Sequence, residues 1–167
     1  MIDDADRRIL AALQYDARLS NVELARRVGL SESPCFRRTR ALEADGAITG
    51  YRAILDRKQL GWTVAAYCLV NLVSHAEENA DAFHRAVAAE PRIVECMLIS
   101  GSYDYILKVV ARSVDDLADL TLKGILQFPN VREVSTAVVF RELKADAGLP
   151  VEGSNGRGVD QPGVRRE

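Results

Sequence analysis

Residues 20–46 of the chain, SNVELARRVGLSESPCFRRTRALEADG, decide the fold of its N-terminal part. They open on a capping box, in which the side chains of Ser20 and Glu23 each satisfy a free backbone amide at a helix start. A short helix is therefore expected over residues 21–28. Gly29 ends this helix, because glycine adopts the left-handed conformation that residues with a Cβ resist.

A second helix start follows after only a few residues. Ser33 provides a hydroxyl cap, and Pro34 then stands at the first helical position, where its missing N–H costs no hydrogen bond. The expected helix runs over residues 34–45 and ends at Gly46. Apolar residues at helical spacing predict another helix upstream, over residues 3–14. Two helices joined by a tight glycine turn are typical of a helix-turn-helix domain.

The last of these helices has the composition of a helix that reads DNA. Arginines bind guanine edges through two hydrogen bonds, and short hydroxyl groups bind phosphates. Residues 1–60 carry a net charge of +2 (11 Lys and Arg against 9 Asp and Glu), whereas residues 61–167 carry −4 (11 against 15). The expected DNA-binding residues are Ser31, Ser33, Arg37, Arg38 and Arg40. A solvated helix face is the alternative, and Arg38 in particular could contact phosphate or pair with Glu43.

The chain beyond this trio of helices changes its pattern twice. Residues 47–55 contain a glycine turn and predict a short β-hairpin or strand, the wing that often follows such helices. The boundary at Leu60-Gly61 then separates a winged helix-turn-helix domain, residues 1–60, from a second domain. Apolar content collapses from Lys144 onward, which predicts a disordered tail over residues 145–167.

The second domain, residues 61–144, alternates short strands with helices. Strands are expected over residues 64–73, 93–100, 105–111 and 131–140, and helices over residues 79–89 and 115–127. The order β-α-β-β-α-β is that of the ferredoxin-like split motif. The predicted fold class is therefore α+β, with a winged helix-turn-helix followed by a ferredoxin-like βαββαβ domain.

A polar and aromatic turn, ISGSYDYI at residues 99–106, separates two apolar strands. A carboxylate at Asp104 could hold an ammonium group, Gly101 would let a ligand approach backbone amides, and Tyr103 could wall the site. The alternative is an ordinary hairpin turn, because Gly, Ser and Asp are common turn residues. The residues alone leave both interpretations open.

Several short motifs occur in the chain in a fixed order. They are IDDADRRIL at residues 2–10, LA at 24–25, VGLS at 28–31, SPCFRR at 33–38, LE at 42–43, GAI at 46–48 and GSYDY at 101–105. Together they resemble the leucine-responsive regulatory protein/AsnC family, also called feast/famine regulators, over about residues 2–144. The chain departs from the family pattern at Ile2, where leucine is usual, and at Ser102, where an acidic residue is frequent.

The resemblance implies how the two domains are used. It implies a homodimer built mainly through the second domain, often assembled further into octamers. It also implies an effector, usually an amino acid, bound between neighbouring dimers near the Gly101–Asp104 turn. Ser135 and Thr136 of the last strand are expected to contribute to that site.

Other classes of site find little support in the sequence. Cys35, Cys68 and Cys96 form no CxxC pair, so neither a disulfide framework nor a zinc site is indicated, and we expect buried apolar thiols. His75 and His84 have no ligand cluster nearby, so no metal or cofactor is expected. No apolar stretch is long enough for a membrane helix and the start is acidic, so cytoplasmic localisation is expected.

These features predict a sequence-specific DNA-binding transcription regulator that responds to a small metabolite, with double-stranded DNA, an amino acid and a second copy of the chain as partners. One alternative is an architectural DNA-binding protein without an effector. Another is a small ferredoxin-like enzyme, because a fold does not determine a function. No nucleophile–base pair or phosphate loop is visible, so we expect no enzymatic activity.

Overall fold

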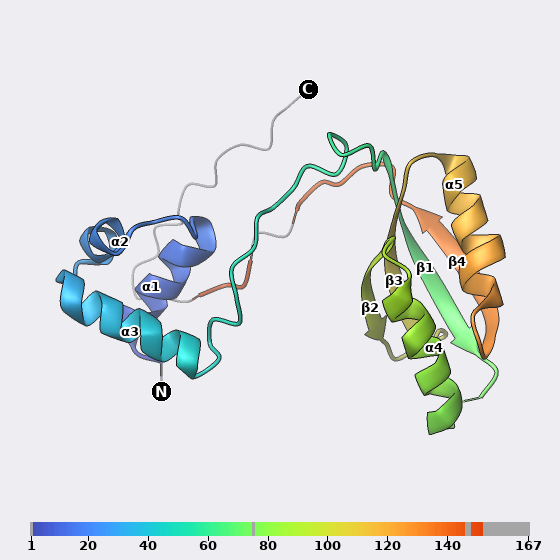
Figure 1. Ribbon diagram of the computed structural model, residues 1–167, viewed down its shortest axis with the longest axis horizontal. Helices are drawn as coiled ribbons and strands as arrows, with labels where there is room; N and C mark the ends of the chain where they lie inside the picture. Colours follow the sequence, from blue (N-terminus) through green and yellow to red (C-terminus); the bar gives the residue numbers. More distant parts are fainter. Residues whose placement is uncertain (1, 75, 146–147, 152–167) are drawn as a thin grey trace. The chain divides into compact units, whose positions relative to one another are not determined.

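A computed structural model describes residues 2–74, 76–145 and 148–151 of the chain. Its contacts group the described residues into two compact units, residues 2–53 with 148–151, and residues 54–74 with 76–145 (Figure 1). Most of the tail predicted to be disordered, residues 146–147 and 152–167, lies outside the described residues. No helix in the described ranges is long and apolar enough to cross a bilayer.

The first unit contains the three predicted helices, α1 (Asp4–Tyr15), α2 (Asn21–Val28) and α3 (Glu32–Ala44). The predicted capping box of α2 is confirmed, since Ser20 and Glu23 exchange hydrogen bonds between side chain and backbone. Gly29 ends α2 with a φ of 70°, in the left-handed region. The two ends of α2 could be predicted from the sequence because each depends on residues only three or four positions apart.

The predicted start of α3 was wrong by two residues. The helix begins at Glu32, Ser31 occupies the N-cap position, and Pro34 is the third helical residue rather than the first. Proline is tolerated there as well, because the first four N–H groups of a helix have no acceptor within it. Ser33 therefore lies inside the first helical turn and does not cap the helix.

The three helices close around their own apolar core. The buried residues are Ile9, Ala12, Leu13, Leu24, Ala25, Val28, Cys35 and Leu42. Two side chains also bind backbone carbonyls across the unit: Asn21 Nδ2 donates to Glu32 O (3.0 Å), and Arg8 Nε donates to Val28 O (3.1 Å). The start of α3 and the end of α2 are thus held by hydrogen bonds as well as by packing.

The predicted wing strand is absent from residues 47–55, all of which the structure describes. Ile48 packs against the helical core and donates its N–H to Leu42 O, and the backbone then continues without strand pairing. A strand needs a neighbour for its backbone groups, and an isolated hairpin is marginal in water. The helices of this unit offer no such neighbour.

The second unit contains the predicted βαββαβ order. Its strands are β1 (Val64–Leu72), β2 (Ile93–Leu98), β3 (Tyr105–Ala111) and β4 (Val131–Val138). They form one antiparallel sheet in the order β2-β3-β1-β4. The helices α4 (Glu77–Ala89) and α5 (Val114–Asp119) pack on this sheet (Figure 1).

The second predicted helix of this unit, residues 115–127, is not a single α-helix. After α5 the chain forms a π-helical turn, η1 (Leu120–Gly124), and then a 3₁₀ turn, η2 (Ile125–Gln127). Leu117, Leu120 and Ile125 are all buried, although Leu120 and Ile125 are five positions apart. A π-turn pairs residues i and i+5, so it returns both side chains to the core, which an α-helix would not.

One face of the sheet is buried and the other is open. The buried face consists of alternate residues of the two central strands: Ala66, Cys68, Val70 and Leu72 on β1, and Tyr105, Leu107, Val109 and Ala111 on β3. These residues pack against Phe83 and Val87 of α4 and against Leu117, Leu120 and Ile125. The intervening residues, such as Leu69 and Ile106, face away from the helices because side chains alternate along a strand.

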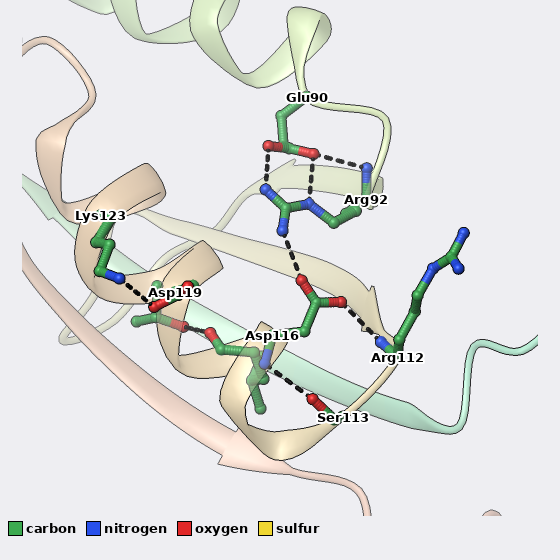
Figure 2. A network of polar contacts seen from close by, with 9 residues as sticks. Glu90, Arg92, Arg112, Ser113, Asp116, Asp119 and Lys123 are labelled. Carbon is green, nitrogen blue, oxygen red and sulfur yellow. Dashed lines mark hydrogen bonds and ion pairs between the residues drawn. The ribbon is translucent and has the colours of Figure 1, made fainter.

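Arg92 joins the end of α4 to the start of α5 (Figure 2). Its guanidinium binds Glu90 (2.7 Å) and Asp116 (2.9 Å), and Asp116 also accepts the Arg112 N–H (2.8 Å). These bonds hold the pKa of the Glu90 carboxyl below its usual range, mainly through Arg92. They lower the pKa of Asp116 as well, through the Arg112 N–H first and Arg92 second.

We predict that Arg92→Met lowers the free energy of unfolding of the second unit by roughly 1–3 kcal/mol, because it leaves two carboxylates without their shared cation. Both carboxyl pKa values are lower in the folded than in the unfolded protein, from ordinary values of 4.5 and 3.8. Their contribution is therefore complete above these values and is lost as the pH falls through the folded pKa values. The difference between wild type and variant should shrink on acidification from about pH 7.

The free energy of unfolding is measured by urea titration. The fluorescence of Trp62, which is the single tryptophan and lies in the second unit, reports the unfolding. Lys123→Met is the matched control, because Lys123 pairs with Asp119 (2.7 Å) but is 77% exposed. That control should change stability by less than about 0.5 kcal/mol. Equal losses in the two variants would contradict a special role for Arg92.

Candidate functional site

The exposed face of α3 carries a row of polar residues. Ser33, Arg37 and Arg40 recur at spacings of four and three, so they share one face of the helix, and all three are exposed. Phe36 lies beside them and is 57% exposed. The sequence analysis did not single out Phe36, which adds an exposed aromatic side chain to this face of the helix.

Arg38 lies on a different side of α3 from this row. Its guanidinium binds the carboxylates of Asp3 and Asp6, both at 2.8 Å, and so ties α3 to the N-terminus of α1. The hydrogen bonds to Asp6 and Asp3 raise the pKa of Arg38 above its usual range. The pairing with Glu43 that the sequence suggested is not the one formed.

Glu43 instead pairs with Arg40 and Tyr51. Arg40 Nη1 lies 2.9 Å from Glu43 Oε2, and the Tyr51 hydroxyl donates to Glu43 Oε1 at 3.0 Å. Burial and the Glu43 carboxylate raise the pKa of Tyr51. The Arg40 side chain remains 69% exposed, so its guanidinium can still reach a ligand outside the protein.

The polar turn between β2 and β3 is tied to the end of β1. Gly101 has a φ of 129°, which favours glycine, and Tyr103 and Asp104 are half-buried. The Asp104 carboxylate accepts the Leu72 N–H at 2.8 Å. Asp104 is therefore a structural residue of the turn, whatever else it binds.

The centre of this turn network is Asn71, which the sequence analysis did not single out. Its Oδ1 accepts the Asp104 N–H (3.1 Å), and its Nδ2 lies 3.2 Å from Ser102 O and 3.4 Å from Glu133 Oε2. Asn71 is 7% exposed. A lone asparagine in the apolar strand at residues 64–73 was the signal that could have revealed it.

The two residues expected on the last strand lie on opposite faces of the sheet. Ser135 pairs with Leu69 and is on the open face, whereas Thr136 pairs with Cys68 and is on the helix side. The Thr136 hydroxyl lies 3.7 Å from Cys68 Sγ. The residue of β4 that joins the turn network is Glu133.

The thiols and histidines form no group suited to a metal within the described ranges. Cys35 and Cys68 are buried as expected, but Cys96, on the edge strand β2, is exposed. Cys96 lines a hollow of about 560 Å³ between α4 and β2, whose lining also includes Leu98 and Tyr105 on either side of the polar turn. His84 binds the Tyr105 hydroxyl at the same hollow (2.8 Å), while His75 lies outside the described residues.

Two protein families match the chain, one for each unit. The winged helix-turn-helix DNA-binding family matches residues 2–49, and the Lrp/AsnC ligand-binding domain matches residues 65–149. A leucine-responsive regulatory protein from Rhizobium meliloti is 39% identical over 143 residues, which cover 86% of this chain and 92% of that protein.

Solved structures show the same likeness in three dimensions. A transcriptional regulator from Neisseria meningitidis, in complex with L-methionine, aligns with a TM-score of 0.86 and 31% identity, over 90% of this chain and 97% of that one. A feast or famine regulatory protein from M. tuberculosis, also complexed with L-methionine, aligns with a TM-score of 0.82 and 29% identity, over 91% and 100%. The chain therefore belongs to the Lrp/AsnC family of DNA-binding transcriptional regulators.

Proposed function

We propose that the chain is a cytoplasmic, sequence-specific regulator of transcription, whose DNA binding or assembly responds to a small metabolite, an amino acid. Residues 1–60 bind DNA, and residues 61–144 sense the effector and form the oligomer. The observation that carries DNA binding is the exposed row of Ser33, Arg37 and Arg40 on α3. An effector-free architectural role is the alternative.

In the proposed DNA interface the residues have different tasks. Arg37 and Arg40 read base edges in the major groove, because arginine binds guanine through two hydrogen bonds. Ser31 and Ser33 contact phosphates at the start of the helix. Arg38 acts mainly as a positioning residue, since Asp3 and Asp6 already hold its guanidinium.

Replacing Arg37 or Arg40 with alanine should weaken binding to the cognate site by roughly 1–3 kcal/mol and relax the base preference. Gel-shift titrations at two salt concentrations measure this, because loss of a phosphate contact also makes the salt dependence shallower. Arg18→Ala is the matched control: Arg18 is exposed in the same unit but outside α3. Unchanged affinity in both variants would remove α3 from the interface.

The open face of the sheet is the proposed dimer interface, with a second copy of the chain as its occupant. Leu69, Ile106 and Val110 are half-buried on this face, and Met97 is 45% exposed. An antiparallel sheet that is covered on one side only leaves such a face to water or to a partner. A two-fold dimer also presents two α3 helices to an imperfect palindrome.

We predict that Leu69→Glu shifts the protein from dimer to monomer at micromolar concentration, because it places a charge at the centre of the apolar face. Sedimentation velocity measures the shift. Leu122→Glu, which alters an exposed leucine of η1 on the helix side, should leave the dimer intact. Wild type that sediments as a monomer would exclude this interface.

The proposed effector site lies at the Gly101–Asp104 turn, near the junction of subunits and with help from Ser135. A zwitterion needs an anion for its ammonium group and donors for its carboxylate. Asp104 supplies negative charge, and the glycine exposes backbone amides. Thr136, the other residue of β4 expected at this site, lies on the helix side of the sheet and contacts Cys68 instead. The L-methionine complexes of two relatives support an amino acid as the effector.

A thermal-shift screen with the common amino acids should find at least one, with methionine as the first candidate, that raises the melting temperature. Asp104→Asn should then weaken its binding about tenfold or more, because it removes the charge yet keeps an oxygen for the Leu72 N–H. Calorimetry on both proteins measures this. If DNA binds but no amino acid does, the architectural alternative is correct.

A further inference from the structure

Asn71 differs from its surroundings in burial and in bonding. Among the residues that the structure describes, it is the one buried polar side chain, at 7% exposure, within a strand that is otherwise apolar. A buried amide is costly unless it is hydrogen-bonded. Each of its two polar atoms has a protein partner, so the network satisfies the hydrogen-bonding capacity of this amide.

The partners of Asn71 determine the orientation of its amide. The Asp104 N–H can only donate, so Oδ1 faces it, and the Ser102 carbonyl can only accept, so Nδ2 faces it. The same Nδ2 lies 3.4 Å from the carboxylate of Glu133. A rotated amide would place donor against donor and acceptor against acceptor, so the side chain has one favourable orientation.

The backbone is irregular at the same point. The pairing of β1 with β4 shifts register between Asn71 and Leu72, so that Arg132 is an extra residue on β4. Leu72 also extends past the last paired residue of β3, which is Tyr105, and its N–H is taken by the Asp104 carboxylate instead. Bulges often lie next to functional sites, where they direct a side chain.

The network therefore joins two surfaces of the second unit. On one side Asn71 holds both the Ser102 carbonyl and the Asp104 amide of the polar turn. On the other side it contacts Glu133, which pairs with Asn71 across β1 and β4 and lies on the open face of the sheet. The Asp104 N–H is shared with Val70 O (3.0 Å), but Asn71 Nδ2 faces both Ser102 O and the Glu133 carboxylate. A shift of the Ser102 carbonyl therefore alters the contact that the same amide makes with Glu133.

We propose that Asn71 is the positioning residue that couples effector binding at the turn to assembly through the open face, with Glu133 as its contact on that face. This inference rests on the proposed function, because it needs an effector at the turn and a dimer on the open face. The coupling is reciprocal, so the effector changes the dimerisation constant by the factor by which dimerisation changes effector affinity.

Asn71→Asp tests the turn side of the network. The carboxylate keeps the size of the amide but removes the donor to Ser102 and faces Glu133 with a like charge. We expect effector affinity to fall about tenfold or more, and the effect of the effector on dimerisation, expected at about fivefold or more in wild type, to disappear. Asn79→Asp adds the same charge at an exposed position of α4 and should change neither quantity.

A double variant that exchanges donor and acceptor between positions 71 and 133 distinguishes a positioning role of Asn71 from a purely structural one. In Asn71→Asp with Glu133→Gln, the glutamine amide can donate to the new aspartate, so that bond returns with its polarity reversed. We expect the double variant to recover a measurable part of the effector-dependent dimerisation that Asn71→Asp loses. A purely structural role predicts that the double variant recovers stability, because the like-charge contact is removed. It does not predict recovery of effector-dependent dimerisation, because Glu133→Gln does not restore the bond to Ser102.

Glu133→Ala provides a test that does not alter the buried position, in case Asn71→Asp does not fold. Glu133 is exposed, so the variant should bind the effector within about threefold of wild type but lose most of the coupling. Calorimetry and sedimentation are run on the full chain, with and without methionine or the strongest thermal-shift amino acid.

The outcomes distinguish the inference from the proposed function. If wild type binds no amino acid, or does not dimerise, the proposed function fails and this inference fails with it. If wild type does both, but Asn71→Asp and Glu133→Ala keep full coupling, only the inference is overturned. Loss of coupling in both, with recovery in the double variant, supports it.

Discussion

The second unit depends on one constraint, the burial of a single face of its sheet beneath the helices. Side chains alternate along β1 and β3, so once Cys68, Val70 and Leu107 enter the core, their neighbours must lie on the other face. That requirement sets the register of the whole sheet. This register places Leu69 on the open face of the sheet, and it places Asn71 at the end of β1, beside the polar turn. A slip of one residue would bury the asparagine among the helices and expose the core.

Stability and signalling make opposite demands at the end of β1. An apolar residue at position 71 would avoid the cost of burying an amide, and regular pairing with β4 would avoid the bulge. The chain instead has a buried asparagine and a register shift at adjacent residues. Such local departures from the pattern of a strand are concentrated at functional sites in proteins. The Arg92 network has the opposite character, because its ion pairs stabilise the packing of α4 and α5 and contact neither Asn71 nor the polar turn.

The sequence predicted features that depend on neighbours along the chain. The capping box at Ser20, the stop at Gly29 and the alternation of β3 are all local, and the family motifs are linear. Features that depend on distant residues escaped prediction. Residues 47–55 find no partner strand among the described residues, Arg38 pairs with carboxylates 32 and 35 positions away, and Thr136 faces the helices because of its register with Cys68. No pattern within a short window contains that information.

The two hydrophobic cores share no residue, since Ile9, Cys35 and Leu42 pack in one and Val70, Phe83 and Leu107 in the other. Substitutions in one core therefore do not change the packing of side chains in the other. Recombination between relatives at the connecting segment would yield hybrids that keep two intact interiors. Such a hybrid would combine the DNA-binding specificity of one relative with the effector specificity of the other. The separate interiors allow the DNA-binding part and the effector-binding part to change independently of one another.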